Sequence, residues 1–574
     1  MQLHPIDAIV LVLYLLGITL LGSWMGRRIS SAAEFFMPRR FGKATMIMHA
    51  FGTGTASDQA VTVASATAKN GLSGIWFQWM WLFSTPFYWL IAPLMRRFRA
   101  VTTADIYELR YDRSVSVLFA VVGIASMAVK IGVMLKGAGA LIDAGTGGMI
   151  DANLAIPVLT LMFVIYGVAG GLGGAIMTDF VQGIMTIIFS FMLLPVVMYE
   201  IGGFTGMKEI IGQANLDRDM LSLVAPGNVG VFFIVMLSIN ALFLIVSVPS
   251  VMGNCAAGKT ELDGRIGFMF GTFIKRVCTI AWCLTAIAAV AWYLKSGIQL
   301  KDIDPDKVYG DMAYRFLPQL VPGMLGIFIA SLLAAVMSSC DSFMIASSGL
   351  FTKNIYQVAC PDRTAGHYVW VGRLAAFCVV ILGVAFSYLT KDVIAGLKIW
   401  YKVGPMIGIA FWLGLLWRRT TVAGAWASTL TGFATWFLIT RPWFVDWVKS
   451  LSFAEPLHLV VSNKQQEVIY DPWQILLYLS AGTLAGIVVS LLTRPVCRER
   501  LNRFYDLTIT PVESGEIIGE PCQLPDGTSP PERAMLLTSF GLEIPRPSRL
   551  SIIGFLLGWV FVGGIIGGFV WLVS

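Results

Sequence analysis

Residues 50–61 read AFGTGTASDQAV, and this stretch decides the fold because it places glycines, hydroxyls and an aspartate inside an apolar segment. Gly52 and Gly54 each weaken a helix interior by about 1 kcal/mol. Asp58 adds a charge that costs about 2.5–3.5 kcal/mol at membrane depth, so such residues usually mark a substrate or ion pathway. Glycines alone are equally typical of close helix packing. Together with Asp58 they predict a helix that is broken at a binding site.

The composition is that of a polytopic membrane protein, with 56% hydrophobic and 13% charged residues among 574. Apolar runs long enough to cross a bilayer recur about fourteen times between residues 6 and 573. The net charge of +7 therefore reports topology and not nucleic-acid binding, because the basic residues lie in short connections between the runs. No soluble segment is large enough to be an enzyme.

The basic residues also predict the orientation of the chain in the membrane. Arg27 and Arg28 follow the first apolar run directly, the reverse of a secretory signal, so residues 1–26 are expected to stay as a transmembrane helix. The positive-inside rule places the basic connections near residues 96–113 and 259–276 in the cytoplasm. Alternation of the spans then puts both termini outside.

Cysteine and histidine positions argue against a metal centre of the usual kind. The eight cysteines form no CxxC pair, and we expect them to be free thiols. The four histidines, at positions 4, 49, 367 and 458, make no cluster. We therefore expect no metal site built from these cysteines and histidines.

Polar side chains in the early spans are candidates for contact with a solute. Lys130 and Lys136 lie six residues apart, about 240° around a helix, so they cannot share a face. Lys130 is nearer the middle of its span, and one of these lysines is expected to neutralise Asp58 or an anionic substrate. Gln78 lies among tryptophans, where its amide contacts either a ligand or an interfacial aromatic belt.

A second apolar segment, residues 229–253, is interrupted by Pro249 and Gly253. Interruptions at matching places in two halves of a chain indicate an inverted-repeat transporter. We expect a transport core over residues 45–417, with one repeat at about 45–202 and the other at about 229–417. Two accessory helices over 418–493, a cytoplasmic connection over 494–549 and a last helix over 550–574 would follow.

The segment 329–351, IASLLAAVMSSCDSFMIASSGLF, carries three serines and Asp341 within two helical turns. Ala335, Ser339 and Ser342 are spaced by four and three residues, so they share one face. Hydroxyl, carbonyl and carboxylate oxygens are what a hard cation binds. Serines alone are typical of close helix packing, but the carboxylate among them favours a cation site.

These segments resemble the sodium/solute symporter family, which includes the sodium/glucose cotransporters, proline permease and bacterial sialic acid transporters. GGLGGAIMTDFVQG at 170–183 is similar to the family's GGxxAVxxTDxxQ, and AAVMSSCDSFMIASSGLFTKNIY at 334–356 is similar to its AAxMSTxxSxxNSxSTxFTxDIY. Further matches are EFFMPRR at 34–40, GLSGIW at 71–76 and TTADIYELRY at 102–111. The resemblance implies an all-α protein with the five-plus-five inverted-repeat leucine-transporter fold and fourteen spans.

The resemblance also implies a principal sodium site. Carried over to this sequence, its ligands would be the backbone carbonyls of Gly52, Thr55 and Ala335. The hydroxyls of Ser338 and Ser339 would complete it.

A second cation site is implied at Asp179, Asp341 and Ser342, where Asp341 replaces the Ser or Thr that relatives usually carry. Two carboxylates around one monovalent cation leave a net negative charge, so one of them is expected to be protonated or paired with a lysine. Our hypothesis is that Asp341 alters the ion stoichiometry or adds proton sensitivity.

Family positions that touch sugars fall on Gln59, Gln78 and Asn240, and the aromatic gate falls on Phe243. Lys130 is similar to the arginine that sialic acid transporters use for a carboxylate. Asp58 and Lys130 either neutralise each other beside a neutral sugar or face the two charges of a zwitterion. The expected substrate-binding residues are therefore Asp58, Gln59, Gln78, Lys130, Asn240 and Phe243.

The function implied is sodium-coupled symport of a small polar organic solute, a sugar in the first place, by alternating access. A carboxylate-bearing solute, such as a sugar acid or amino acid, is the alternative. A solute sensor on the same fold is an alternative of another class. The expected partners are the solute, sodium and the lipid bilayer, with no nucleic acid, and the expected form is a monomer in the plasma membrane.

Overall fold

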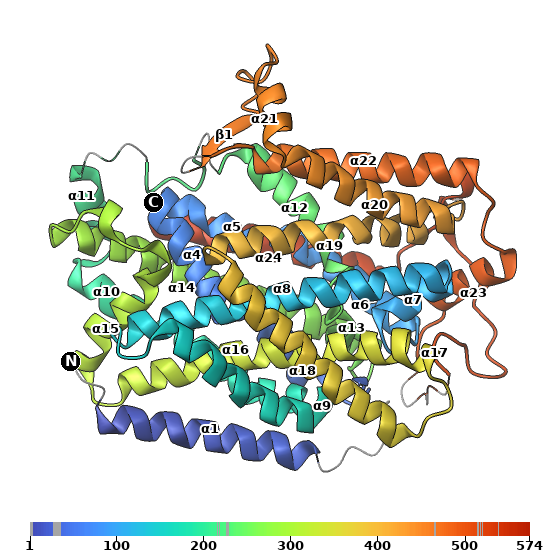
Figure 1. The fold of residues 1–574 in the computed structure, drawn as a ribbon, viewed down its shortest axis with the longest axis horizontal. Coiled ribbons are helices and arrows are strands. Elements are labelled where there is room, and N and C mark those ends of the chain that lie inside the picture. Colours follow the sequence, from blue (N-terminus) through green and yellow to red (C-terminus); the bar gives the residue numbers. More distant parts are fainter. Residues whose placement is uncertain are drawn as a thin grey trace.

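Long helices run side by side along the longest axis of the molecule in the computed structural model (Figure 1). The structure describes residues 4–26, 36–214, 216, 219–225, 229–463, 466–513, 516, 518, 520–537 and 539–574. Within these ranges nine helices are long and apolar enough to cross a membrane, and three shorter apolar helices accompany them. The count of fourteen spans stays a prediction, because interrupted helices fall below the length of a full span.

The first part of the chain, up to residue 213, is a series of helices. Their bounds are α1 (Pro5–Gly26), α3 (Lys43–Gly54), α4 (Ser57–Asn70), η1 (Gly71–Ile75), α5 (Trp76–Trp79), α6 (Thr85–Arg97), α7 (Thr103–Arg110), α8 (Arg113–Gly145), α9 (Ala152–Met192), α10 (Leu194–Glu200) and α11 (Gly203–Gln213). The turn η1 is 3-10 helical.

The middle of the chain continues as helices up to residue 439. Their bounds are α12 (Val231–Ile245), α13 (Val251–Ala256), α14 (Glu261–Lys295), η2 (Leu300–Asp302), η3 (Pro305–Lys307), α15 (Val308–Leu320), α16 (Met324–Gly349), η4 (Leu350–Tyr356), α17 (Gln357–Ala359), α18 (Ala365–Leu389), α19 (Val393–Leu416) and α20 (Val422–Ile439). The turn η4 is π-helical and prolongs α16.

The last part of the chain adds short strands to the helices. Its elements are α21 (Pro442–Lys449), β1 (Val460–Asn463), β2 (Gln466–Ile469), α22 (Asp471–Leu492), α23 (Arg498–Ile509), β3 (Met535–Leu537), η5 (Ser539–Gly541), β4 (Ile544–Pro545) and α24 (Arg549–Val573). Strand β1 pairs antiparallel with β2, with Val461 opposite Val468, and β3 pairs antiparallel with β4.

The predicted helix break is confirmed between α3 and α4. Helix α3 ends at Gly54, and Thr55 and Ala56 have extended backbones before α4 begins at Ser57. The second predicted interruption is also present, because α12 ends at Ile245 and α13 begins only at Val251. Both breaks free backbone carbonyls and N–H groups in the middle of the protein, which is tolerated at membrane depth only beside protein or a cavity.

The glycine-rich turn near residue 170 is a bend within one helix. Gly171 has φ +54° and ψ −166° inside α9, a backbone conformation that side chains other than hydrogen disfavour. The residues before and after Gly171 therefore form the two arms of α9. The bend brings Asp179, in the second arm, to a fully buried position.

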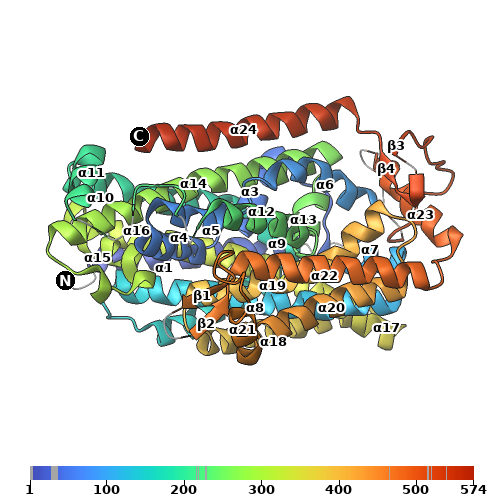
Figure 2. The ribbon, with the colours of Figure 1, turned by 90° about the horizontal axis from the view of Figure 1, so that it is seen from above.

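The helices form an enclosed centre and a peripheral layer. The apolar stretch of α16 is 89% buried inside the protein, whereas that of α24 is 22% buried. Helix α24 lies along one side of the bundle (Figure 2), and its exposed residues are those of a lipid-facing helix. The segments that carry the ion and solute motifs belong to the enclosed centre.

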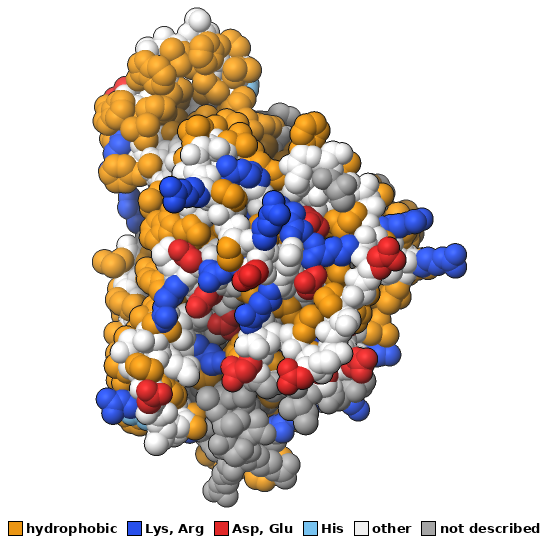
Figure 3. All heavy atoms as spheres, turned by 90° about the vertical axis from the view of Figure 1, so that its right-hand side faces the viewer, with side chains coloured by type: hydrophobic (Ala, Val, Ile, Leu, Met, Phe, Trp, Pro, Cys, Tyr) orange, Lys and Arg blue, Asp and Glu red, His pale blue; other side chains and the backbone are white. Residues whose placement is uncertain are grey.

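One end of the molecule carries a group of charged side chains. Both chain termini lie at one end, and α23 lies at the other (Figure 1). Acidic and basic side chains gather in the middle of that second end (Figure 3), where Arg97 pairs with Glu261 at 2.8 Å and Arg99 with Glu516 at 2.6 Å. The predicted connection 494–549 thus packs against the transport core, while Arg27 and Arg28 lie outside the described residues.

One topological interpretation is wrong. Lys275 and Arg276 were expected in a cytoplasmic connection, but the structure places both inside α14, 8% and 1% exposed. Helix α14 begins at Glu261, behind a capping box in which Thr260 and Asp263 bond each other's backbone N–H groups. The connection therefore ends some fifteen residues earlier than the charges suggest.

Candidate functional site

A cavity opens beside both helix breaks. Thr53 and Gly54 line it from α3, and Ser250 and Asn254 line it from the second interrupted segment. Of the predicted substrate-binding residues, the structure brings three to its wall. These are Gln59, Gln78 and Lys130.

Asp58 forms an ion pair with Lys130 next to this cavity. The Nζ atom of Lys130 donates to Asp58 Oδ2 at 2.6 Å, and both side chains are buried. The same ammonium lies 4.9 Å from the centre of the Trp400 ring, a favourable cation–π distance. The prediction that one of two lysines neutralises Asp58 is confirmed for Lys130, whereas Lys136 lines a separate opening.

Asn240 and Phe243 lie on α12, outside the residues that line the cavity. The amide of Asn240 donates to the carbonyl of Tyr401 at 2.7 Å and accepts from the hydroxyl of Tyr478 at 2.6 Å. That amide joins α12 to α19 and α22. The backbone of Phe243 lies against Gly408 of α19, where a Cβ atom would come within 2.1 Å of its carbonyl oxygen. Both residues therefore occupy helix contacts in this conformation.

Two further cations line the cavity. Both were expected from the sequence to lie in a loop. Lys275 Nζ donates to the carbonyl oxygen of Gly54, and Arg276 donates from Nη1 to the carbonyl of Gln78 at 2.8 Å. A sequence signal for them exists, because GTFIKRVCTIAW places the pair between apolar residues on both sides. Charged residues in such a setting usually face a bundle interior or cavity.

Three of the predicted principal sodium ligands, Gly52, Ser338 and Ser339, lie where α3 meets α16. The carbonyl oxygen of Gly52 accepts from the Ser339 hydroxyl at 2.9 Å and from the backbone N–H of Thr55 at 3.1 Å. A Cβ atom at Gly52 would lie 2.5 Å from Ser338 Oγ, so the two helices touch at this point. Ala335 is fully buried on the same helix. The donor set of carbonyl and hydroxyl oxygens suits a hard monovalent cation.

Asp179 of α9 joins this cluster through two neighbours. One carboxylate oxygen accepts from the Ser338 hydroxyl, and the other lies 2.6 Å from His49 Nδ1. Thr53 connects the same histidine to Ser342, with oxygen distances of 3.3 Å to His49 Nδ1 and 3.0 Å to Ser342 Oγ. The structure therefore brings Asp179 and Ser342 of the predicted second cation site into one network.

His49 and Thr53 are members of this network that sequence reasoning did not single out. They are four residues apart, one turn of α3, so their side chains share a face. His49 is 1% exposed. Its position inside an apolar run, next to glycines, is the sequence feature that indicates a functional residue.

Asp341, the third predicted residue of the second cation site, is fully buried on α16. Its carboxylate faces the first arm of α9, because a Cβ atom at Gly167 would lie 2.5 Å from Asp341 Oδ1. Tyr14 of α1 is within electrostatic reach of this carboxylate. Asp341 thus approaches α9 on the opposite side of its bend from Asp179.

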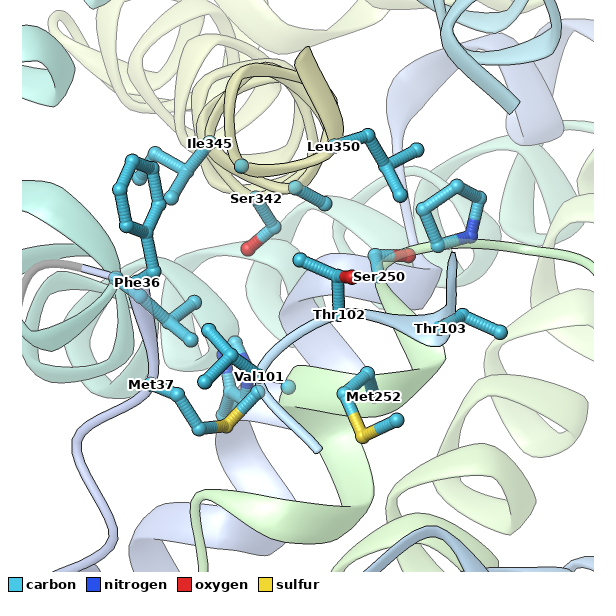
Figure 4. Close-up of a pocket in the computed structure, with 16 residues that line it drawn as sticks. Phe36, Met37, Val101, Thr102, Thr103, Ser250, Met252, Ser342, Ile345 and Leu350 are labelled. Carbon is cyan, nitrogen blue, oxygen red and sulfur yellow. The ribbon is translucent and has the colours of Figure 1, made fainter. Parts of the chain in front are cut away.

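A second, smaller cavity lies between α7 and the ion cluster that contains Ser342. His49 and Ser342 line it on one side, and Thr102 and Thr103 on another. Figure 4 shows the Ser342 hydroxyl pointing into this space. The ion cluster therefore borders a cavity that reaches toward the charged end of the protein, where Arg99 and Arg110 lie.

Two interrupted helices, a polar cavity beside them and an oxygen cluster between α3 and α16 define a secondary transporter of the inverted-repeat class. The chain belongs to the Sodium:solute symporter family, whose family model matches residues 35–432. The protein is thus a multi-pass membrane transporter and not an enzyme, and sodium is the coupling ion of its family.

Curated relatives of the chain carry different solutes in their names. The osmoregulated proline transporter OpuE of Bacillus subtilis is 24% identical over 85% of this chain and 94% of its own length. The sodium/glucose cotransporter of Vibrio parahaemolyticus is 26% identical over 73% and 82%. The sodium/pantothenate symporter of Haemophilus influenzae is 24% identical over 67% and 80%.

Among solved structures, a substrate-bound, outward-open Na⁺-coupled sialic acid symporter matches with a TM-score of 0.67. The match covers 85% of this chain and 98% of that chain at 16% identity. At this identity the likeness shows the fold, which is the leucine-transporter fold predicted from the sequence.

Proposed function

We propose that the protein moves a small polar organic solute together with sodium by alternating access. The observation that carries this proposal is the break between α3 and α4. Gly54, at the break, accepts from Gln59 Nε2 at 2.7 Å and from Lys275 Nζ, both of which line the solute cavity. Its neighbours Gly52 and Thr55 carry the proposed sodium carbonyls, so one short segment serves both ligands.

The principal sodium ion binds at the contact of α3 with α16. The carbonyls of Gly52, Thr55 and Ala335 and the hydroxyls of Ser338 and Ser339 replace its water. Because these ligands come from two helices, bound sodium joins the helices and favours the state in which they touch. Release of sodium lets them part.

A second cation binds at Asp179, Asp341 and Ser342. The network from Asp179 through His49 and Thr53 to Ser342 supports the proposal, since it gathers oxygen ligands beside the first site. Ser338 contacts Asp179 directly, so occupation of one site changes the ligands of the other.

The ion gradient supplies the free energy for accumulation. One sodium ion entering down about 100 mV gains about 2.3 kcal/mol, and a tenfold concentration gradient adds about 1.4 kcal/mol. Together they support several hundredfold accumulation of a neutral solute per ion, on the order of 500-fold. A second ion would roughly square that ratio.

For the solute, a sugar matches the amides of Gln59 and Gln78, which hydrogen-bond hydroxyl groups. The alternative, a carboxylate-bearing solute, is supported by the cations Lys130, Lys275 and Arg276 in the cavity wall. We further propose a monomer in the plasma membrane with both termini outside, on the basis of the positive-inside rule applied to the basic connections and of the position of both termini at one end of the molecule (Figure 1).

Uptake into proteoliposomes tests the proposed function. Purified protein would be reconstituted, loaded with choline buffer and diluted into sodium buffer with a labelled solute panel of sugars, sugar acids and amino acids. Symport predicts transient accumulation above equilibrium only with inward sodium, and its collapse with a sodium ionophore. Equal uptake in choline, or equilibration without accumulation, would identify a uniporter or channel instead.

A further inference from the structure

The solute cavity contains more positive charge than its carboxylates balance. Lys130, Lys275 and Arg276 line it, and each is at least nine-tenths buried. The described residues that line the cavity include no carboxylate. Asp58, immediately behind the wall, pairs with Lys130. Lys275 and Arg276 therefore face the cavity without a paired carboxylate among the described residues.

Each of these two cations has unused hydrogen-bond donors. The ammonium of Lys275 has three N–H groups, and in the described part of the chain a single acceptor, the carbonyl of Gly54, is bonded to it. Arg276 donates from Nη1 to the carbonyl of Gln78, and its Nε has no partner within the described residues. An adjacent ammonium and guanidinium with free donors form a binding site for an oxyanion.

Burying a cation without a counter-ion is costly. A neutral solute would leave that cost in place, whereas an anion removes it on binding. The positive charges of Lys275 and Arg276 therefore favour a solute that carries a negative group. The planar guanidinium of Arg276 matches the geometry of a carboxylate.

The same wall presents acceptors that need donors from the ligand. Gln59 Oε1 and Asn254 Oδ1 are buried and lack hydrogen-bond partners among the residues that the structure describes. Hydroxyl or amine groups of a solute would satisfy them. Trp81 and Trp400, with ring centroids 5.9 Å apart, give the cavity an aromatic side for the carbon skeleton.

We infer that the transported solute is a small hydroxylated organic anion, whose acidic group binds to Lys275 and Arg276 and whose hydroxyls bind to Gln59 and Asn254. The inference rests on the proposed symport and assigns the substrate class of that site. It also links solute to ion, because a carboxylate on Lys275 draws its ammonium away from Gly54, the residue between the proposed sodium carbonyls of Gly52 and Thr55.

Thermal stabilisation of the purified protein tests this assignment, since a ligand that binds only the folded state raises the melting temperature. The probes are acids, each paired with a neutral analogue: glucuronate with glucose, gluconate with glucitol, and lactate with propane-1,2-diol. Each is measured in sodium chloride and in choline chloride. We expect at least one acid to raise the melting temperature in sodium by several degrees while its neutral partner does not. Equal stabilisation by a neutral partner, or stabilisation by none of the acids, would overturn the inference.

Variants then test whether Lys275 and Arg276 bind the acidic group of the solute. Lys275→Gln and Arg276→Gln should each weaken binding of the stabilising acid at least tenfold, whereas Lys275→Arg should retain it. Lys295→Gln, at the exposed end of the same helix, is the matched control and should bind as the wild type does. Sodium-induced stabilisation without solute shows that each variant is folded. Unchanged acid binding by both folded Gln variants would contradict the assignment.

The comparison of sodium chloride with choline chloride distinguishes a failure of this inference from a failure of the proposed function. Stabilisation by an acid to the same extent in choline would contradict sodium coupling and leave the anion assignment standing. Stabilisation by a neutral sugar in sodium alone would support symport and overturn the anion assignment.

Discussion

Lys130 and Asp58 form a buried ion pair at the wall of the solute cavity, with 2.6 Å between Nζ and Oδ2. The pair joins α8 to α4, immediately beyond the break that also carries the proposed sodium carbonyls. Since Asp58 neutralises Lys130, the pair serves as part of the wall and leaves Lys275 and Arg276 as the charges available to a solute. The Asp58–Lys130 pair thus holds the wall of this cavity together, and the proposed solute contacts fall to Lys275 and Arg276.

Removing one partner of this pair should destabilise the protein strongly. Asp58→Asn or Lys130→Gln leaves an uncompensated charge in a buried site, which costs about 3–5 kcal/mol. We expect a clear drop in melting temperature for each single variant in detergent. The double variant removes both charges and should recover most of the loss. Additive losses in the double variant would show that the two side chains do not interact.

Gly52 and Gly54 should respond differently to the same substitution. A Cβ atom at Gly52 would lie 2.5 Å from Ser338 Oγ, whereas at Gly54 the nearest neighbouring atom, Lys275 Nζ, would be 4.0 Å away. Gly52→Ala should therefore push α3 from α16 and abolish sodium-induced stabilisation. Gly54→Ala, the matched control, should keep it, since alanine also favours the helix by about 1 kcal/mol. The comparison is made by thermal shift over a sodium titration, and equal responses would argue against the contact as the ion site.

Ser339→Ala should lower the apparent sodium affinity about tenfold, because it removes one oxygen ligand worth about 1.5 kcal/mol. Ser347 lies on the same helix, is equally buried and donates to the carbonyl of Phe343 one turn earlier. Ser347→Ala is thus a matched control and should leave the sodium half-saturation of uptake unchanged. A similar shift in both variants would assign the effect to packing of α16.

His49→Leu should weaken the second cation site. The substitution removes the partner of Asp179 Oδ2 and the link to Thr53, so Asp179 loses its orientation as well as a hydrogen bond worth about 1.5–3 kcal/mol. We expect lower cooperativity of uptake with sodium concentration. His367→Leu, which removes a partly buried histidine bonded to Tyr356, is the control and should retain wild-type cooperativity. Retained cooperativity in His49→Leu would place this histidine outside the ion network.

Local sequence predicted the features that depend on the cost of polar groups in a membrane. The breaks after Gly54 and before Val251 follow from glycine and proline in apolar runs. The pairing of Asp58 with Lys130 follows from the cost of a lone buried charge, although 72 residues separate them. Each of these predictions needed only the residue and its apolar surroundings.

Other assignments failed because they depend on which helices meet. Lys275 and Arg276 were expected in a loop, because the sequence does not show whether a helix has already begun at charged residues near the end of an apolar run. Asn240 stays a predicted solute residue, and in this structure its amide is bonded to Tyr401 and Tyr478, more than 160 positions away. His49 acquires its partner only when the bend at Gly171 turns the second arm of α9 back toward α3.

Asp341 should set the number of cations moved per solute. It is fully buried on α16 and its carboxylate faces α9 at Gly167, and in the proposed second cation site its charge would add to that of Asp179. Asp341→Asn removes that charge and should lower the charge moved per solute molecule by one, whatever the charge of the solute itself. The accumulation ratio should fall by about 500-fold for a driving force of about 100 mV and a tenfold sodium gradient. Proteoliposomes held at a potassium diffusion potential measure both quantities, with Asp341→Glu as the variant that keeps the charge. An unchanged charge-to-solute ratio and an unchanged pH profile in Asp341→Asn would exclude this carboxylate from ion coupling.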